Sequence, residues 1–231
     1  MPNRITRRQF AATVVTGALL ATWQTARAQS GFLHWMERWN ERVERFVFGS
    51  ERLAAEVPPG ETTPTEDFPS YFISDTVPVA PAGWALKVGG LVARPTTFSL
   101  EQLQQMPRTD MRVRHHCVEG WSAVAAWHGV RLRDVADIVG ADPQAPYVEF
   151  RSFDAGYWSS WDRASALHKQ TILAYGMNGL PLSPDHGAPL RLYAAVKLGY
   201  KMVKYLTEVN FLPERTGGYW EDQGYEWFAG V

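Results

Sequence analysis

The sequence has very little cysteine, because Cys117 is the single one among 231 residues. An internal disulfide and a C-x-x-C-H haem motif are therefore excluded. The chain also lacks a flavin or nicotinamide fingerprint, and its apolar stretch from Ala11 to Ala21 is short for a membrane span. The net charge is only −1, so bulk electrostatics predict neither nucleic acid nor an anionic membrane as a partner.

The composition is that of a single globular domain. Aromatic residues make up 13% of the chain, which is typical of a folded protein rather than a disordered one. No internal repeat and no low-complexity run divides the sequence. After subtraction of a leader, we expect about 180 to 200 residues to form one domain with a sizeable core.

Residues 1–28 have the features of an export signal. Thr6 to Phe10 is a twin-arginine pattern, a short apolar stretch follows, and Ala26-Arg27-Ala28 is an A-x-A site. Twin-arginine signals are addresses that a receptor reads, not anchors. We therefore expect cleavage before Gln29 and a periplasmic mature protein, with an uncleaved amphipathic anchor as the alternative.

Residues 29–67 are expected to be an amphipathic helix followed by an extended connector. Apolar residues recur at helical spacing between Phe32 and Leu53, and charged residues of both signs stand between them. The Pro/Thr-rich stretch from Val57 to Pro69 predicts extended chain on the surface. The apolar helix face could pack on its own domain or dock on a membrane partner, since tryptophans suit an interface.

Residues 68–231 are expected to form a mixed α+β domain. Short alternating segments predict strands and short capped segments predict helices, without a repeating β–α–β rhythm. The tail after Gly217 is expected to be surface cover. The predicted strands lie at residues 84–92, 109–116, 147–151, 190–195 and 204–211, and the predicted helices at residues 100–105, 131–139 and 164–168.

Cys117 follows one of these strands, next to two histidines and an arginine in the stretch Arg114-His115-His116-Cys117-Val118-Glu119-Gly120-Trp121. An unpaired cysteine in an exported chain is a reactive thiol, a metal ligand or a buried small hydrophobe. Nearby positive charge lowers the pKa of a thiol and favours the thiolate, which binds soft metals. On this local chemistry alone, a functional thiol and an inert core residue are equally open.

Four separate motifs resemble those of the sulfite-oxidase-fold molybdenum enzymes, and most closely their periplasmic branch, which includes bacterial methionine sulfoxide reductases. They are Cys117-Val118-Glu119-Gly120-Trp121-Ser122 with Trp127-His128-Gly129-Val130, Met177-Asn178-Gly179-Leu180-Pro181-Leu182, His186-Gly187-Ala188-Pro189-Leu190-Arg191 and Lys197-Leu198-Gly199-Tyr200-Lys201. They keep the family's order over about residues 68 to 228. The resemblance implies a sulfite-oxidase-type domain and a Mo-molybdopterin cofactor, with the Cys117 thiolate as a direct metal ligand.

The resemblance also implies where the cofactor's phosphate end binds. His186 and Arg191 match the family's pair of pterin- and phosphate-contacting residues. Gly199, Tyr200 and Lys201 match a turn in which glycine lets the backbone approach a phosphate closely. We therefore expect these five residues to contact the cofactor, with Arg191 and Lys201 holding the phosphate.

Five further positions match cofactor contacts less closely. The stretch with Tyr71, Ser74 and Thr76 resembles the family's first pterin-contacting strand, although the two hydroxyl residues replace an arginine and a histidine. Ser152 and Asp154 match a hydroxyl and an acidic position in the loop after the central strand. For this loop pair, a capping role is equally open.

On the substrate side, Glu119 and Trp121 stand where sulfite oxidases carry an arginine just after the cysteine. A carboxylate and an indole suit a neutral or cationic substrate and disfavour an oxyanion. Tyr157 falls near the family's active-site tyrosine, so Cys117, Glu119 and Tyr157 are the candidate catalytic residues. The two histidines before the cysteine could gate protons or simply be packed.

These features predict a periplasmic oxidoreductase that transfers an oxygen atom and reduces an S- or N-oxide, either a small molecule or a methionine-sulfoxide-type substrate. Electrons would come from a separate donor such as a membrane b-type cytochrome, because the chain has no haem, flavin or nicotinamide motif of its own. The alternatives are a sulfite dehydrogenase and a molybdopterin-carrying electron-transfer or regulatory protein without turnover. We expect a monomer, since the segment that dimerises sulfite oxidases is missing.

Overall fold

The computed structural model describes residues 35–36, 39–44, 46–47, 52–154 and 156–231. The chain divides into two compact units, residues 1–46 and 47–231. The described residues of the first unit are helical, and the rings of Trp35 and Trp39 stack with centroids 6.2 Å apart. The predicted signal peptide lies outside the described residues. Among those that are described, no helix has the length and apolarity needed to cross a bilayer.

The second unit begins before the boundary expected at residue 68. Residues 57–67 contain two short 3-10 helices, η1 (Pro59–Glu61) and η2 (Thr65–Asp67). The backbone N–H of Val57 donates to the Arg112 carbonyl at 2.9 Å, and that of Thr63 donates to the Val124 carbonyl at 2.9 Å. The expected connector is therefore fixed along two strands of the domain.

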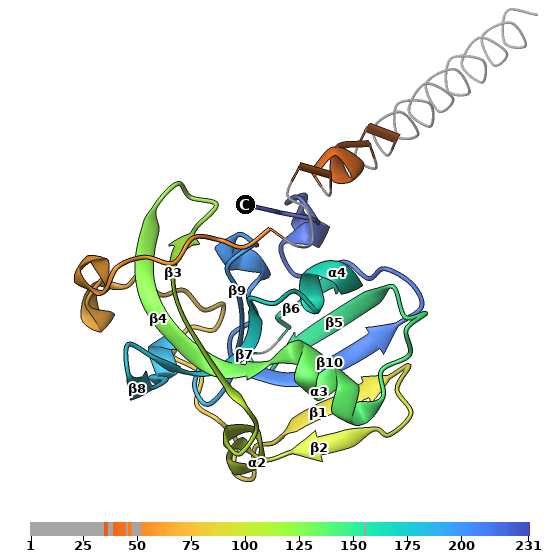
Figure 1. Ribbon diagram of the computed structural model, residues 1–231, viewed down its shortest axis with the longest axis horizontal. Helices are drawn as coiled ribbons and strands as arrows, with labels where there is room; N and C mark the ends of the chain where they lie inside the picture. The colour runs from red at the N-terminus through yellow and green to blue at the C-terminus, as the bar shows by residue number, and fades with distance from the viewer. Residues whose placement is uncertain (1–34, 37–38, 45, 48–51, 155) are drawn as a thin grey trace, which may run out of the picture. The chain divides into compact units, whose positions relative to one another are not determined.

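Two sheets form the domain (Figure 1). The first has the order β2-β1-β10-β5-β6, with β1 and β10 parallel. The second has the order β3-β4-β7-β8, and β9 also pairs with β7. The strands are β1 (Leu86–Gly90), β2 (Thr96–Phe98), β3 (Arg108–His116), β4 (Ser122–Arg131), β5 (Tyr147–Ser152), β6 (Trp158–Asp162), β7 (Thr171–Met177), β8 (Leu180–Pro181), β9 (Arg191–Ala194) and β10 (Leu206–Leu212).

The helices are short and their ends are clear in the sequence. α2 (Leu100–Gln104) begins with a capping box, in which Ser99 and Gln102 each accept a backbone N–H of the other. α3 (Leu132–Val139) ends at Gly140, whose φ of 64° is the left-handed conformation that favours glycine. α4 (Arg163–Ala166) begins at Asp162, whose carboxylate accepts the Ser165 N–H. These three helices lie where the sequence predicts them.

Five strands are absent from the sequence prediction, namely β2, β4, β6, β7 and β8. All seven residues of β7 are buried, and most of β4 is buried as well. A strand covered on both faces has no alternation of apolar and polar residues, so its pattern gives no period-two signal. Burial therefore explains why β4, β6 and β7 were not predicted, whereas β2 and β8, with three and two residues, are too short to show an alternating pattern.

Two expectations about irregular segments are corrected by the structure. Residues 71–78 form no strand; residues 73–76 are a bend. The tail after Gly217 is more than surface cover, because Trp227 and Phe228 are buried at 2% and 6% exposure. Their indole and phenyl rings are large apolar groups, so burying them fastens the tail to the domain.

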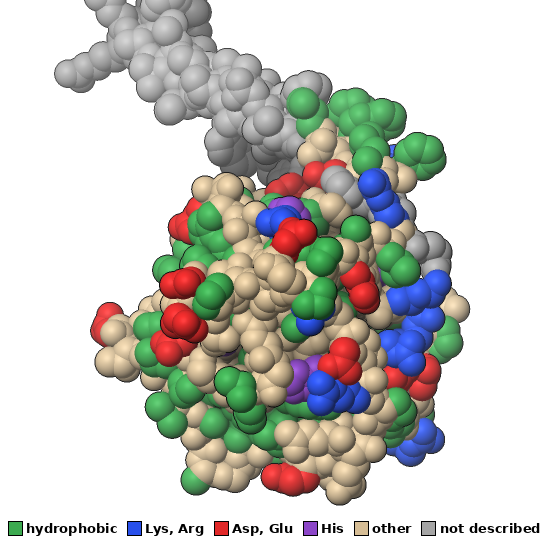
Figure 2. All heavy atoms as spheres, turned by 60° about the vertical axis from the view of Figure 1, so that its left-hand side comes forward, with side chains coloured by type: hydrophobic (Ala, Val, Ile, Leu, Met, Phe, Trp, Pro, Cys, Tyr) green, Lys and Arg blue, Asp and Glu red, His purple; other side chains and the backbone are tan. Residues whose placement is uncertain are grey.

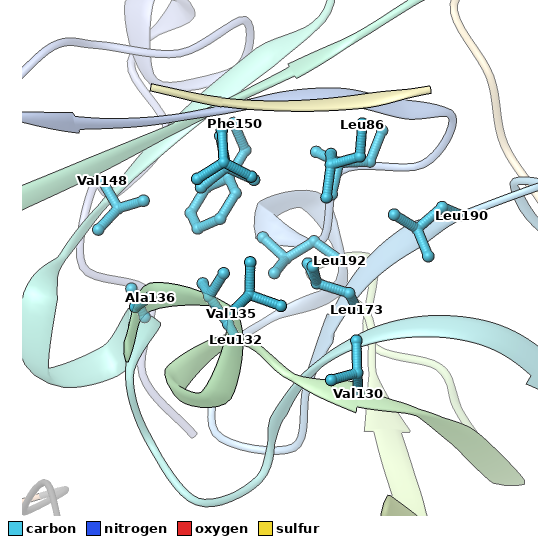
Figure 3. Close-up of a cluster of buried hydrophobic side chains, with 14 of the residues drawn as sticks. Leu86, Val130, Leu132, Val135, Ala136, Val148, Phe150, Leu173, Leu190 and Leu192 are labelled. Atoms are coloured by element: carbon cyan, nitrogen blue, oxygen red, sulfur yellow. The ribbon is translucent and has the colours of Figure 1, made fainter. Parts of the chain in front are cut away.

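The main core lies where α3, the first sheet and β9 meet (Figure 3). Leu132 and Val135 of α3, Val148 and Phe150 of β5, and Leu192 of β9 are each fully buried. A second cluster is built around β3, β4 and β7 and includes Trp127 and Tyr193. The two clusters hold the loops at the ends of the sheets in fixed positions, and these loops form the candidate site.

Candidate active site

A cavity of about 250 Å³ lies at the ends of the strands. Six segments line it: residues 68–73, the turn after β3, the loop after β5, residues 185–191, the 3-10 helix η4 (Gly199–Lys201) with the residues that follow it, and the C-terminal tail. The predicted site residues that line it are Tyr71, Cys117, Glu119, Ser152, Asp154, Tyr157, His186, Arg191, Gly199 and Tyr200. Three predicted residues, Ser74, Thr76 and Lys201, are not among the described residues of its lining.

Cys117 lies in a tight turn at the end of β3. Its backbone N–H donates to the Trp121 carbonyl at 3.0 Å, and its carbonyl accepts the Gly120 N–H at 3.1 Å. Gly120 has a φ of 93°, so glycine suits this turn. The turn places the Cys117 thiol 3.8 Å from the Glu119 carboxylate, which also accepts the Trp121 indole N–H at 2.9 Å.

The charge environment of the thiol differs from the expectation. Burial raises the pKa of Cys117, and the Glu119 charge raises it further. The Arg114 guanidinium points to Glu61, at 3.5 Å. Burial lowers the pKa of His115 to about 3, so its ring is neutral at neutral pH. Without a metal, Cys117 is therefore a protonated thiol rather than the thiolate that the neighbouring basic residues predict.

Arg191 is a buried cation in the cavity wall. It is 5% exposed, its guanidinium lies 4.8 Å from the centre of the Trp127 ring, and Nη1 donates to the His186 carbonyl at 3.1 Å. Within the described residues, its Nε is buried without a hydrogen-bond partner. Burial lowers the pKa of Arg191 to about 10, so it remains charged but poorly solvated.

Lys204 supplies a second cation to the cavity, and the sequence prediction did not include it among the site residues. Its ammonium donates to the Asp185 carbonyl at 2.8 Å. Burial lowers the pKa of Lys204 to about 7, with the Arg191 charge as the next cause. The lysines that follow Gly199 in the sequence suggested a cationic site, but their spacing could not show which lysine points into the cavity.

Lys201 occupies a different place from the one predicted. Its side chain is fully buried and forms an ion pair with Glu221 of the tail. Its Nζ also donates to the Ser160 carbonyl at 3.0 Å. The backbone turn that the motif predicts is present, but the lysine side chain that could contact an anion in the cavity is Lys204.

The two other members of that motif line the cavity wall. A Cβ on Gly199 would lie 2.6 Å from the His115 ring, so only glycine fits there. The Tyr157 hydroxyl donates to the Tyr200 carbonyl at 2.5 Å, and burial strongly raises the pKa of Tyr157. Tyr157 is therefore a neutral phenol that supports η4, and its hydroxyl can donate to a reactant only if this hydrogen bond breaks.

Asp154 ties two walls of the cavity together. Its carboxylate accepts the backbone N–H of Ile73 at 3.0 Å and the hydroxyl of Ser74. The Ser152 hydroxyl accepts the Asp154 N–H at 2.9 Å, which is the capping role that was left open. Thr76 is exposed, so in this group Asp154 and Ser74 fix residues 71–76 against the loop after β5.

The cavity fits a flat anionic cofactor with a soft metal. It has one thiol for the metal, and two cationic side chains, Arg191 and Lys204, in its lining for an anion. The buried Nε of Arg191 and Nδ1 of His115 have no hydrogen-bond partner among the described residues, and a buried polar group without a partner indicates a missing ligand or water. Molybdopterin has the phosphate, the heterocycle and the dithiolene that such a site requires.

The surface outside the cavity has no extended field of one sign on the face in view. Figure 2 shows acidic, basic and apolar side chains interspersed there.

Comparison with known proteins agrees with this site. The oxidoreductase molybdopterin binding domain matches residues 74–220. The chain is 40% identical over 196 residues to the putative protein-methionine-sulfoxide reductase subunit YedZ1 of Azospira oryzae, covering 84% of this chain and 74% of that protein. It is 36% identical over 154 residues to the protein-methionine-sulfoxide reductase catalytic subunit MsrP of Xanthomonas axonopodis pv. citri, covering 60% and 48%.

A solved structure has the same fold. The sulfane dehydrogenase SoxCD from Paracoccus pantotrophus superimposes with a TM-score of 0.63 over 74% of this chain and 52% of that one, at 20% identity. The domain match covers the cavity lining from His115 to Trp220. The chain therefore belongs to the molybdopterin-binding oxidoreductases of the sulfite oxidase family, and it is an enzyme of that family.

Proposed function

We propose that this protein binds Mo-molybdopterin in the cavity and reduces a neutral S- or N-oxide, with electrons from a separate donor. The observation that carries the choice of substrate is the Glu119 carboxylate, which lines the cavity 3.8 Å from the Cys117 thiol. The names of the relatives, which include a methionine sulfoxide reductase catalytic subunit, support the same direction of reaction.

The residues that would hold the cofactor are those of the cavity lining that offer a thiol, cations and free backbone. Cys117 would give its thiolate to the metal, and Arg191 and Lys204 would contact the phosphate, with the backbone of Gly199 close beside it. When bound, the cofactor would supply oxygen-atom transfer and storage of the two electrons. The chain itself supplies the burial that excludes water and the turn that fixes Cys117.

Glu119 would select against anions. Two charges about 4 Å apart interact by about 4 kcal/mol near a protein surface. The exposed Glu119 carboxylate accepts the Trp121 indole N–H, which orients it beside the Cys117 thiol. A sulfite dianion would be repelled by this order of energy, whereas a neutral sulfoxide or amine oxide would bind without that cost.

The reaction also requires a partner. Reduction of a sulfoxide consumes two electrons and two protons and releases the oxygen as water, and the sequence has no haem, flavin or nicotinamide motif to deliver electrons. We infer a separate donor of the membrane b-type cytochrome kind. The twin-arginine pattern supports export to the periplasm, and we expect the chain itself to act as a monomer.

The test is steady-state kinetics on the protein exported through its own leader. Reduced viologen dye is the electron donor for dimethyl sulfoxide, methionine sulfoxide and trimethylamine N-oxide, and ferricyanide is the acceptor for sulfite. We expect oxide reduction and negligible sulfite oxidation at neutral pH. Glu119→Gln should raise sulfite binding by at least about tenfold, whereas Glu208→Gln on the surface should not.

Other results would change the assignment. Sulfite oxidation that exceeds oxide reduction in the unmutated protein would make it a sulfite dehydrogenase. A protein that contains molybdenum and pterin but turns over neither class would be an electron-transfer or regulatory carrier.

A further inference from the structure

The C-terminal tail, defined here as residues 216–231, forms one wall of the cofactor cavity. Trp220 and Tyr225 are part of the cavity lining, and their rings lie 5.1 Å apart. The Trp220 ring also lies 6.0 Å from that of Tyr71, on the opposite segment 68–73. The tail and the segment 68–73 therefore meet at this pair of rings beside the cavity.

A buried ion pair fastens the tail next to Trp220. Glu221, the following residue, has a side chain that is only 4% exposed, and it pairs with the Lys201 ammonium, whose side chain is 0% exposed. The Ser159 hydroxyl donates to the same Glu221 carboxylate at 2.6 Å. Lys201 belongs to η4, whose Gly199 lines the cavity. The ion pair thus joins two walls of one cavity.

The far end of the tail is fastened to the segment just before η4. The Leu198 N–H donates to the Ala229 carbonyl at 3.0 Å, and the Lys197 ammonium donates to the Phe228 carbonyl. Between the two fastenings, the Tyr200 hydroxyl donates to the Glu226 carbonyl at 2.5 Å. The tail also contacts β6, where the Tyr219 N–H donates to the Trp158 carbonyl at 2.9 Å and the Trp227 indole N–H donates to the Ser160 hydroxyl at 2.9 Å.

We propose that Lys201 and Glu221 are a positioning pair, which holds Trp220 against the cavity and sets how long the bound cofactor stays. A buried ion pair is weak evidence for net stability, because desolvation offsets its attraction. Loss of one partner, however, leaves a buried charge unpaired, which favours opening of the segment that carries it. Since that segment is a cavity wall, its opening would expose the cofactor.

This inference rests on the cofactor part of the proposed function, and its test separates the two. The holoprotein is purified, and its molybdenum and pterin contents are measured first. It is then incubated below the melting temperature of every variant, and pterin release is followed by the fluorescence of its oxidised form. Hydrogen exchange of the amides at residues 219–227 is measured on the same samples.

Glu221→Gln and Lys201→Met are expected to release the pterin at least about tenfold faster than the wild type, with faster amide exchange in the tail. The matched variants Lys87→Met and Glu208→Gln remove partners of an exposed pair at 3.6 Å and should leave both rates unchanged. Trp220→Ala keeps the ion pair and should also speed release, so the inference stays testable if the ion-pair variants fold poorly.

A core variant controls for general destabilisation. Val88 is 2% exposed in β1 and does not line the cavity, so Val88→Ala lowers stability without touching the tail. Release from Val88→Ala as fast as from Glu221→Gln would overturn the inference, as would wild-type release from Trp220→Ala. A wild-type protein without pterin would instead refute the proposed function itself.

Discussion

Replacing Arg191 by methionine should move the stability of the apoprotein and the retention of the cofactor in opposite directions. The guanidinium is almost fully buried, and its Nε has no hydrogen-bond partner among the described residues. A pKa lowered from 12.5 to about 10 corresponds to about 3 kcal/mol by which the folded apoprotein disfavours the charged form. Because the folded pKa is the lower one, this cost is complete at neutral pH and fades only above pH of about 10.

Two favourable contacts reduce that cost. The guanidinium lies over the Trp127 ring, which is worth about 1 kcal/mol, and its hydrogen bond to the His186 carbonyl contributes about 1 kcal/mol. The remainder is a cost of about 1 kcal/mol for keeping Arg191 charged in the apoprotein. Arg191→Met should therefore raise the melting temperature of the apoprotein by roughly 2 to 4 °C.

The holoprotein should respond in the opposite sense. A charge-assisted hydrogen bond to a phosphate is worth about 1.5–3 kcal/mol, so Arg191→Met should weaken cofactor binding by about ten- to a hundredfold. Apoprotein from cells without molybdopterin synthesis gives the first measurement, and molybdenum content after export gives the second. Arg133→Met, an exposed arginine on α3, should change neither. An apoprotein destabilised by Arg191→Met together with full cofactor occupancy would show that Arg191 is structural and refute this reasoning.

Two further predictions concern the metal ligand and the second cation. Cys117→Ser should abolish activity and the thiolate-to-metal absorption while leaving the protein soluble, because a hydroxyl is a poor ligand for a soft metal; full activity would end the assignment. Lys204 has a folded pKa of about 7, below its ordinary value of 10.5, so the unfolding free energy of the apoprotein should rise by about 1.4 kcal/mol per pH unit as the pH increases above about 7. Denaturant titrations between pH of about 7 and 9 should show this slope in the wild type and a flatter one in Lys204→Met.

The parts of the fold that could be predicted are those that depend on interactions between residues close together in the sequence. Ser99 and Gln102 predict the start of a helix, and Gly140 predicts the end of one. Caps can be read locally because they bind the free backbone groups of a helix end within a few residues. β7 gave no such signal, since each of its residues is buried and alternation requires one solvated face. The segment at 71–78 was expected to be a strand by resemblance, yet the Asp154 carboxylate fixes its backbone as a bend instead.

The candidate site shows the same division between backbone and side chains. The order of the motifs correctly predicted that Cys117, Arg191 and Gly199 line one cavity, because the fold brings their backbone turns together. The pKa of Cys117 could not be predicted from its basic neighbours, since Arg114 turns toward Glu61 and His115 is buried and neutral. Sequence proximity gives the distance between backbones, whereas the sign of an electrostatic effect depends on where each side chain ends.

Lys201 is the clearest example. Its backbone forms the turn that the motif predicts, but its side chain does not line the cavity. In a continued 3-10 helix, side chains three residues apart would point the same way, but η4 ends at Lys201 and the chain is no longer helical at Met202. Lys204, three residues later, takes the cavity side, and Lys201 enters the core, where only a carboxylate makes a buried ammonium tolerable. The tail supplies that carboxylate through Glu221. Lys201 is thus not a third cation for the cofactor. It instead pairs with Glu221 and so helps to hold the C-terminal tail against the cavity.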